Sequence, residues 1–488
     1  MARLQQASRT ALTVFLVLGA VASAGTWFIL TAITPHWDAS RSPGVIKHSY
    51  EVDVVYGQSE ASWTTIETNL FARYAQAQGW DDTSVKFVIF VGESTKKHVA
   101  SIIAGEGADV ILATTAQAAF FSDQGMIEPL DDYLEDWADY RDGFINKKVL
   151  DSCRGRDGKV LGLPSYVSSP AFYSIRRDWL AALGLEAPDT FEKARVTWHA
   201  FTYDDPDGNG KDDTYGYAMP MLALQGAHVN WGLTPFMCAV GVRWYNTDIQ
   251  GRYIPTFNTP EAVTVLQFIK RCYKEGLFGT DVMFRKDPPF LSHLAMQVAG
   301  MGGSYRADYY EYTADWFGIY DKIQAVPFLW MDEQAKKQRR YGTRSYPTRL
   351  RCVMRTSSNK QAAWRYLKYF FSREIYGKYV NSIEQPSGRL SYLGRFGLMA
   401  GESPWLPLRN DVKLPVLLDV ELRRAIEPLD EFVVSAPIMM ASWTTISEAL
   451  SEIFVDFYLD RYPSAQAALD EAEKQFVAIL EVYNQQLN

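Results

Sequence analysis

Strand and helix patterns alternate along the first part of the chain, and this alternation restricts the fold more than any other feature. Tyr50 to Tyr56 alternates as a strand does, and Trp63 to Gln76 has its large apolar residues at helical spacing. A second strand pattern at Val85 to Val91 and a second helix pattern at Thr95 to Ala104 follow. A βαβα order predicts an α/β fold with a mainly parallel sheet and helices on both faces.

Length and charge restrict the function. A chain of 488 residues is too long for one ordinary hydrophobic core, so two or three domains are expected. The net charge of -8 argues against nucleic acid as a partner, because nucleic-acid-binding proteins usually have a basic surface. Aromatic residues make up 14% of the chain. They fit either aromatic-rich cores or an aromatic-lined ligand cleft, and the sequence leaves both open.

The N-terminus carries a membrane-type segment. Ala11 to Ile33 contains no charged residue and is long enough to cross a hydrocarbon layer of about 30 Å as a helix. Arg3 and Arg9 precede it, and this charge order predicts that the rest of the chain lies outside the cell. We therefore expect residues 1–34 to be an uncleaved anchor and residues 35–47 a linker. Cleavage after Ala22-Ser23-Ala24 is the alternative, which would release the chain.

The stretch Gly158 to Lys193 carries an ordered set of short motifs. A strand ending at Leu163-Pro164 leads through Tyr166 to a second strand, Ala171 to Ile175, and then to a helix, Asp178 to Leu183, that Gly184 closes. The motifs are GKVLGLP, FYS and GLEAPDTFEK. This order resembles the crossover between the two lobes of family 1 extracellular solute-binding proteins, the maltose-binding-like receptors of ABC importers.

Further motifs of the same family follow in the family's order. They include GMIEPLDDY at residues 125–133, the segment Phe290 to Tyr305, and the helix pattern SNKQAAWRYLKYFFS at residues 358–372. The resemblance extends over nearly all of residues 50–483. It implies a two-lobed clamshell of type II, similar to periplasmic binding proteins, in which each lobe is a mainly parallel sheet flanked by helices. By the family layout, the first lobe comprises residues 48–166 and 322–373, including the strands Ile323 to Leu329 and Arg349 to Met354. The second lobe comprises residues 167–321 and 374–488.

An acidic loop, DDPDGNGKDD, follows the crossover. Counted from Asp205, alternate positions offer oxygens in the order of a calcium loop, with Gly210 at the sharp turn. The expected ligands are Asp205, Asp207, Asn209, the carbonyl of Lys211, and Asp213. Gly216 stands where an EF-hand has its bidentate Glu, so a solvated turn without metal is the alternative. Resemblance to oligosaccharide receptors that carry a matching loop implies a structural Ca²⁺.

A sugar site combines aromatic plates with polar groups that fix orientation. By the resemblance, Trp63, Tyr166, Tyr305 and Trp443 occupy positions that face the cleft, and Tyr305 and Trp443 are the strongest candidates. Arg306 is expected to bind the ligand beside them, and the other polar candidates are Asp53, Glu60 and Arg389. Each aromatic residue taken alone could equally be ordinary core.

The cysteines and histidines carry no motif for catalysis or metal binding. The four cysteines lack CxxC spacing, and Cys238 and Cys272 could form a disulfide or, like the others, remain buried thiols. The six histidines are scattered without an HExxH or triad context.

Together these observations predict a non-enzymatic receptor at the cell membrane that captures an oligosaccharide between two lobes and delivers it to the permease subunits of an ABC transporter. Two alternatives stay open. One is an extracytoplasmic enzyme that acts on polysaccharides, which would need a carboxylate pair or a Tyr/His base. The other is a subunit that reports its ligand to a membrane signalling protein.

Overall fold

The fold comes from a computed structural model that describes most of the chain. The described residues are 44–52, 68–91, 94–104, 107–167, 172–284, 290–304, 317–340, 342–345, 347–373, 411, 433–435 and 440–487. The predicted anchor and all but the last residues of the predicted linker lie outside them. None of the helices within the described residues is long and apolar enough to cross a membrane.

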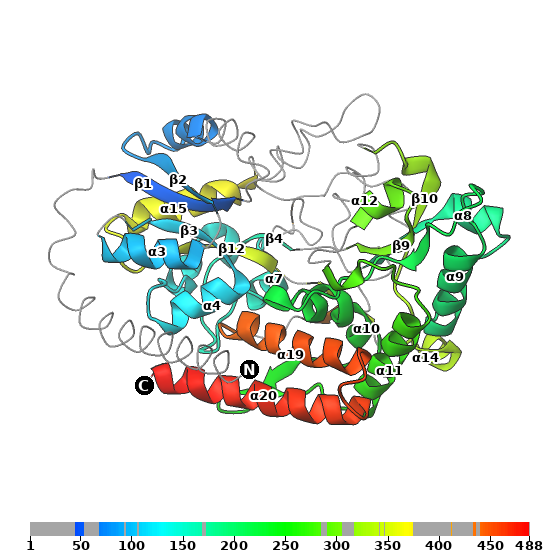
Figure 1. The fold of residues 1–488 in the computed structure, drawn as a ribbon. Coiled ribbons are helices and arrows are strands. Elements are labelled where there is room, and N and C mark those ends of the chain that lie inside the picture. The colour runs from blue at the N-terminus through cyan, green and yellow to red at the C-terminus, as the bar shows by residue number, and fades with distance from the viewer. Residues whose placement is uncertain are drawn as a thin grey trace.

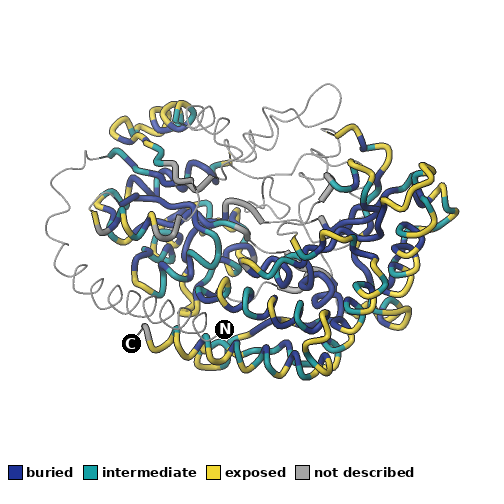
Figure 2. Tube along the Cα trace, in the orientation of Figure 1, coloured by how far each residue is buried: buried dark blue, intermediate teal, exposed yellow. Residues whose placement is uncertain are grey.

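Two separate hydrophobic cores divide the chain into two lobes that lie side by side (Figure 1). The first core contains Ile46, Phe71, Val110, Leu163 and Tyr366. The second core draws its side chains from residues 172–329 and 440–480. Figure 2 shows buried backbone inside each lobe and exposed backbone on the outward helices. The expected two-lobed α/β arrangement is therefore present.

The first lobe is built on a five-stranded sheet with the order β2-β1-β3-β12-β4. The strands are β1 (Val45–Val52), β2 (Ser84–Val91), β3 (Val110–Thr114), β4 (Leu163–Val167) and β12 (Pro347–Val353). β1 pairs with β2 and β3 in parallel, whereas β12 runs antiparallel to both of its neighbours. Four of the five strands thus share one direction, as the βαβα pattern predicted.

Helices cover this sheet. Residues 68–77 are helical, which agrees with the expected first helix. The other first-lobe helices are α3 (Ser94–Ile103), α4 (Thr115–Asp123), α5 (Asp131–Glu135), α6 (Ala138–Arg141), α7 (Lys147–Asp151) and α15 (Lys360–Phe370). α15 buries one face, with Trp364, Tyr366 and Phe370 in the first core, as its 3.6-residue spacing predicts.

The second lobe contains a four-stranded sheet with the order β10-β5-β9-β6. The strands are β5 (Phe172–Arg176), β6 (Tyr215–Tyr217), β9 (Ala299–Ser304) and β10 (Ile323–Val326). β5 pairs antiparallel with both β10 and β9, and only β9 and β6 are parallel. The prediction of a mainly parallel sheet is therefore wrong for this lobe.

The position of β10 also corrects the predicted division of the chain. The family layout placed Ile323 to Leu329 in the first lobe, but β10 pairs with β5. Ile323 and Leu329 are buried in the second core. A strand pattern in the sequence identifies a strand but not its partner, and here the partner lies in the other lobe. The chain returns to the first lobe only with β12.

Helices pack around the second sheet. Those with α-helical geometry are α8 (Arg177–Ala182), α9 (Phe191–Tyr203), α10 (Thr234–Ala239), α11 (Pro260–Lys274), α12 (Phe290–Ala295), α14 (Glu333–Gln338), α19 (Trp443–Tyr458) and α20 (Ala465–Leu487). α11 starts as its sequence predicts, because the Thr259 side chain accepts from the Ala262 N–H and Pro260 stands at the first turn. Gly184 follows α8 with a φ of 64°, as expected of a helix-closing glycine.

Short elements complete the second lobe. They are the 3₁₀ turns η3 (Leu224–Gly226), η5 (Val282–Phe284) and η6 (Tyr320–Lys322), the π-helix η4 (His228–Leu233), and the strand pairs β7 (Tyr245–Thr247) with β8 (Tyr253–Pro255) and β11 (Thr343–Ser345) with β13 (Val433–Ser435). α20 begins beneath the second lobe and extends along the lower edge of the molecule to the first (Figure 1).

Two predicted boundaries are wrong at residue level. β1 begins at Val45, so the last three residues of the expected linker belong to the sheet, with Ile46 fully buried. The strand that was expected to end at Leu163-Pro164 instead begins there as β4 and includes Tyr166. β1 begins directly after Gly44, and β4 can contain Pro164 because it is an edge strand of the sheet.

Candidate functional site

The predicted ligand residues are only partly within the described structure. Six of them lie outside the described residues: Asp53, Glu60, Trp63, Tyr305, Arg306 and Arg389. Tyr166 and Trp443 lie inside them. The geometry that can be assigned to the site therefore comes from these two positions and their surroundings.

Tyr166 lies where the chain leaves the first lobe. It is the fourth residue of β4, in register with Arg349 of β12. β4 ends at Val167, and the next described strand, β5, starts at Phe172 in the other lobe. The backbone of Tyr166 is therefore at the junction between the lobes, where the family resemblance expects it.

Trp443 is the first residue of α19 and is half-buried. Its indole Nε1 donates a hydrogen bond to Asn230 Oδ1 at 2.9 Å. Its ring lies 5.1 Å from the Tyr245 ring and 6.2 Å from the Trp244 ring, measured between centroids. The indole is therefore held by a hydrogen bond at its polar end and by aromatic rings along its body, so its orientation is fixed before any ligand arrives.

The start of α19 also lies at the junction of the lobes. Met440 is buried in the second core, and Ala441 packs against the first. Trp443 follows two residues later on the same segment. Trp443 also packs against the second core, so its role as a stacking residue for a ligand stays a prediction.

Asn230, which accepts the hydrogen bond from Trp443, was not among the predicted residues. It lies on the π-helix η4, and a π-helical turn inside other helical structure is rare and frequently occurs at functional sites. Its side-chain nitrogen also reaches Ser447 Oγ, at 3.3 Å, on the second turn of α19. The partners Asn230 and Trp443 are 213 residues apart in the sequence. The only local signal is a polar residue within the apolar stretch Gln225 to Asn246.

His228 fixes the start of η4. The ring is fully buried, with Nδ1 2.9 Å from the Pro220 carbonyl oxygen and Nε2 3.1 Å from the Tyr458 hydroxyl. The carbonyl can only accept, so Nδ1 carries the proton and Nε2 accepts from Tyr458. Burial lowers the pKa of His228 to about 4, because the charged ring would lose its hydration. This histidine is a structural group, as the sequence suggested for the scattered histidines.

The acidic loop has part of the arrangement that calcium requires. The Asn209 side-chain nitrogen lies 2.9 Å from Asp207 Oδ2 and 3.2 Å from Asp213 Oδ1, so these three side chains converge. The two oxygens of Asp205 accept from the backbone N–H groups of Asn209 and Gly210, and the same Asn209 N–H also lies 3.3 Å from Asp207 Oδ1. Within the described residues, no group of three or more His, Cys, Asp or Glu side chains is arranged to hold a metal. The loop thus supplies fewer converging oxygens than the six to eight that Ca²⁺ prefers.

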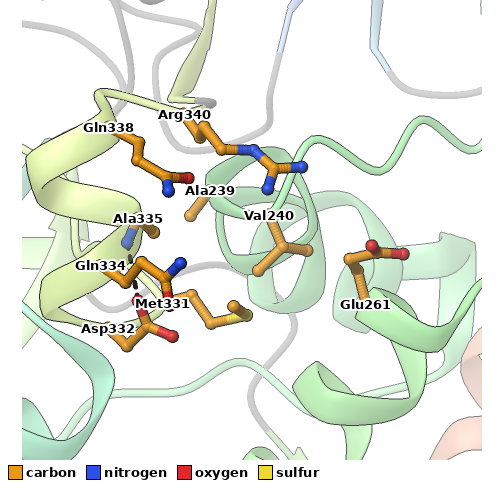
Figure 3. Close-up of a pocket in the computed structure, with 9 residues that line it drawn as sticks. All are labelled: Ala239, Val240, Glu261, Met331, Asp332, Gln334, Ala335, Gln338 and Arg340. Atoms are coloured by element: carbon orange, nitrogen blue, oxygen red, sulfur yellow. Dashed lines mark hydrogen bonds between the residues drawn. The ribbon is translucent and has the colours of Figure 1, made fainter.

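A pocket of about 140 Å³ opens on the second lobe between the end of α10, the start of α11 and α14 (Figure 3). Its lining residues are Ala239, Val240, Glu261, Met331, Asp332, Gln334, Ala335, Gln338 and Arg340. In Figure 3 the Arg340 guanidinium lies above Val240 and the Glu261 carboxylate lies to its right. None of the predicted ligand or metal residues that the structure describes lines this pocket.

The cysteines are all buried free thiols, so the predicted alternative of a disulfide between Cys238 and Cys272 is wrong. Cys153 and Cys352 lie in the first core, Cys272 lies in the second, and Cys238 is also buried. Burial raises the pKa of Cys153 to about 12, which keeps this thiol protonated and unreactive at neutral pH.

Comparison with known proteins identifies the family. The sequence model of the family described as "Bacterial extracellular solute-binding protein" matches residues 69–392, about two thirds of the chain. The chain belongs to this family. The membership predicted from the crossover and its companion motifs is therefore confirmed, and the family's extracellular character agrees with the predicted extracytoplasmic location of the folded part.

Relatives of known name share part of the sequence. Lipoprotein LipO of Bacillus subtilis is 31% identical over 201 residues, which cover 40% of this chain and 39% of LipO. The polygalacturonan/rhamnogalacturonan-binding protein YtcQ of the same organism is 32% identical over 162 residues, which cover 32% of this chain and 30% of YtcQ. The chain thus matches well under half the length of either relative.

Among solved structures, a solute-binding protein of an ABC transporter from Thermotoga lettingae, bound with α-D-tagatose, has the same fold. The TM-score is 0.66 at 18% identity, with 89% of this chain and 99% of the other covered. This agreement over nearly all of both chains supports the two-lobed architecture.

Proposed function

We propose that this protein is an extracytoplasmic receptor that captures a carbohydrate, specifically an oligosaccharide, between its lobes and delivers it to the permease of an ABC transporter. The observation that carries the proposal is a solute-binding chain with two lobes and an indole, Trp443, fixed at their junction. Delivery would follow from closure, since two lobes joined by crossing segments can close around a ligand and present a new shape to a partner.

The ligand class is supported by the site and by the relatives. The face of an indole is suited to the C–H groups of a sugar ring, and the amide of Asn230 holds that face in one orientation. YtcQ carries the name of a binder of polygalacturonan and rhamnogalacturonan, and the Thermotoga lettingae protein holds a sugar. These names favour saccharides over the amines and phosphates that other solute-binding proteins take.

A thermal-shift screen tests the ligand class. Ligands that bind only the folded protein raise its stability by RT ln(1 + [L]/Kd), about 2.7 kcal/mol at one hundred times Kd. We expect oligosaccharides, with oligogalacturonates among them, to raise the melting temperature by several degrees. Spermidine and glycerol 3-phosphate serve as contrasting ligands, an amine and a phosphate. A shift with one of these and with no saccharide would overturn the carbohydrate assignment.

The proposed receptor performs no chemistry on its ligand. In support, the family to which the chain belongs is described as one of solute-binding proteins. After incubation with any saccharide that binds, chromatography should recover it intact. Release of shorter saccharides at a rate proportional to protein concentration would favour the polysaccharide-acting enzyme instead.

Membrane attachment through Ala11 to Ile33 is part of the proposal. The length and lack of charge of this run support an uncleaved helix that holds the folded part at the outer face of the membrane. The full chain should stay in the membrane fraction after carbonate extraction, whereas a chain that starts at Gly44 should be released. If expression of the full chain instead yields a protein that lacks residues 1–24, the segment is cleaved.

A structural Ca²⁺ in the acidic loop is also proposed. Asp207, Asn209 and Asp213 already converge, and Asp205 shares the Asn209 N–H with Asp207. Calorimetric titration of EDTA-treated protein should detect one Ca²⁺, and Asp207→Ala should abolish its binding. Asp212→Ala is the matched control in the same loop. Equal calcium binding by Asp207→Ala and the control would refute the site.

A further inference from the structure

One buried carboxylate joins the two lobes. Asp123, the last residue of α4 in the first lobe, has a side chain that is only 6% exposed. Its Oδ1 accepts from Arg156 Nε at 2.9 Å, within the same lobe. Its Oδ2 accepts from the Tyr483 hydroxyl at 2.9 Å. Tyr483 belongs to α20, whose Phe476 and Leu480 are buried in the second core.

The neighbourhood of this carboxylate is also shared between the lobes. On the second-lobe side, the β7–β8 hairpin lies against the first-lobe loop, since a Cβ placed on Gly251 would be 3.4 Å from the Arg156 carbonyl oxygen. Burial raises the pKa of Tyr253, and the nearby charge of Asp123 raises it further. Burial likewise raises the pKa of Asp123, although Arg156 and Tyr483 oppose this effect. The hydrogen bond from Tyr483 to Asp123 is therefore partly shielded from water, and a hydrogen bond to a charged group is strong in such surroundings.

The sheet topology places the contact on the side of the first lobe opposite to the ligand. β3 runs from Val110 to Thr114, and α4 then returns over roughly 13 Å. Soon after α4, Ile127 bridges to Met354 beside the starting end of β3. Asp123 thus lies near the amino ends of the parallel strands.

The chain segments that cross between the lobes lie at the other end of these strands, at their carboxyl ends. Val167, the last residue of β4, pairs with Pro347, the first residue of β12. Arg349 of β12 is in register with Thr114, the last residue of β3. Ligands of open α/β sheets bind outside the carboxyl ends of the strands, on this same side. The crossings therefore stand between the ligand side and the Asp123–Tyr483 contact.

This arrangement couples the Asp123–Tyr483 contact to the movement of the lobes. If the second lobe rotates about the crossings so that the lobes approach each other on the ligand side, the part of α20 beyond the crossings moves away from α4. We propose that the hydrogen bond from Tyr483 to Asp123 is a latch that opposes closure of the lobes and thereby lowers the affinity for ligand. The latch rests on the proposed function in one respect: the lobes must close when the ligand binds.

The latch can be tested without any ligand. Tyr483→Phe removes the hydroxyl and keeps the ring. Spin labels on Gln76→Cys in the first lobe and Val196→Cys in the second, both at exposed positions, report the distance between the lobes, and the four native thiols are buried. In ligand-free protein, Tyr483→Phe should increase the population with the shorter distance several-fold. An unchanged distribution, or a shift to longer distances, would overturn the latch.

Tyr203→Phe is the matched control. Its hydroxyl donates to the Glu275 carbonyl oxygen at 2.7 Å, within the second lobe, so its loss should leave the distance between the lobes unchanged. A shift in this control equal to that of Tyr483→Phe would show a general loosening and refute the latch.

Affinity separates the latch from the proposed function. With trigalacturonate as the probe, Tyr483→Phe should lower the apparent Kd by up to about tenfold, because the fraction of binding-competent protein rises. If trigalacturonate and the other saccharides fail to bind while the distance still shifts, the carbohydrate assignment fails and the latch stands. If a saccharide binds with unchanged affinity and the distance does not shift, the latch fails and the receptor stands.

Discussion

Burial of His228 should make the stability of the second lobe depend on pH. The folded-state pKa of about 4 lies below the ordinary value of 6.5, so in this range the unfolded chain binds a proton that the folded chain does not. The contribution of a neutral His228 is therefore complete above pH 6.5 and is lost as the pH falls towards 4. At about 1.36 kcal/mol for each pH unit, the total loss is about 3 kcal/mol.

His228→Gln tests this reasoning. Urea unfolding between pH 4.5 and 7.5 should show that the free energy of unfolding falls less steeply with decreasing pH in the variant, by about 1 kcal/mol per pH unit. The variant is also less stable at pH 7, because the buried Tyr458 hydroxyl loses its acceptor, but the slope is the decisive quantity. His199→Asn, an exposed substitution on α9, should keep the parent slope. Equal slopes for the parent and His228→Gln would refute the account of the buried neutral ring.

Three further predictions concern packing and the site. Gly300→Ala should destabilise the protein by about 1–3 kcal/mol in urea unfolding, because the added Cβ would lie 2.0 Å from a ring carbon of Phe201; a neutral result would contradict this close approach. A double-mutant cycle of Trp443→Phe and Asn230→Ala should give a coupling of about 0.5–1.5 kcal/mol, and additive effects would mean that the indole hydrogen bond is absent. Unfolded protein, without reductant, should titrate four thiols per chain, and two would indicate a disulfide.

Much of the fold could be predicted because it depends on local patterns. β2 is a compact run of apolar and β-branched residues and appears where the sequence placed it. α11 likewise depends on local signals, since Thr259 caps it and Pro260 begins it. The crossover motifs identified the family because their order within Gly158 to Lys193 is more specific than any one of them.

The remaining features depend on partners that are distant in the sequence. β10 has the pattern of a strand, but its pairing with β5 was decided by the packing of the second core. Asn230 meets Trp443 across 213 residues. Asp123 meets Tyr483 across 360 residues. No periodicity or motif links such pairs, so the polar half of the site and the contact between the lobes became evident only in the folded chain.

The central claim is that two lobes close around an intact saccharide. Small-angle X-ray scattering of the protein with and without the saccharide that gives the largest thermal shift tests it most directly. The account predicts a smaller radius of gyration on binding, with the saccharide recovered unchanged from the same sample. An unchanged radius of gyration at saturation, or recovery of shortened saccharide, would contradict it.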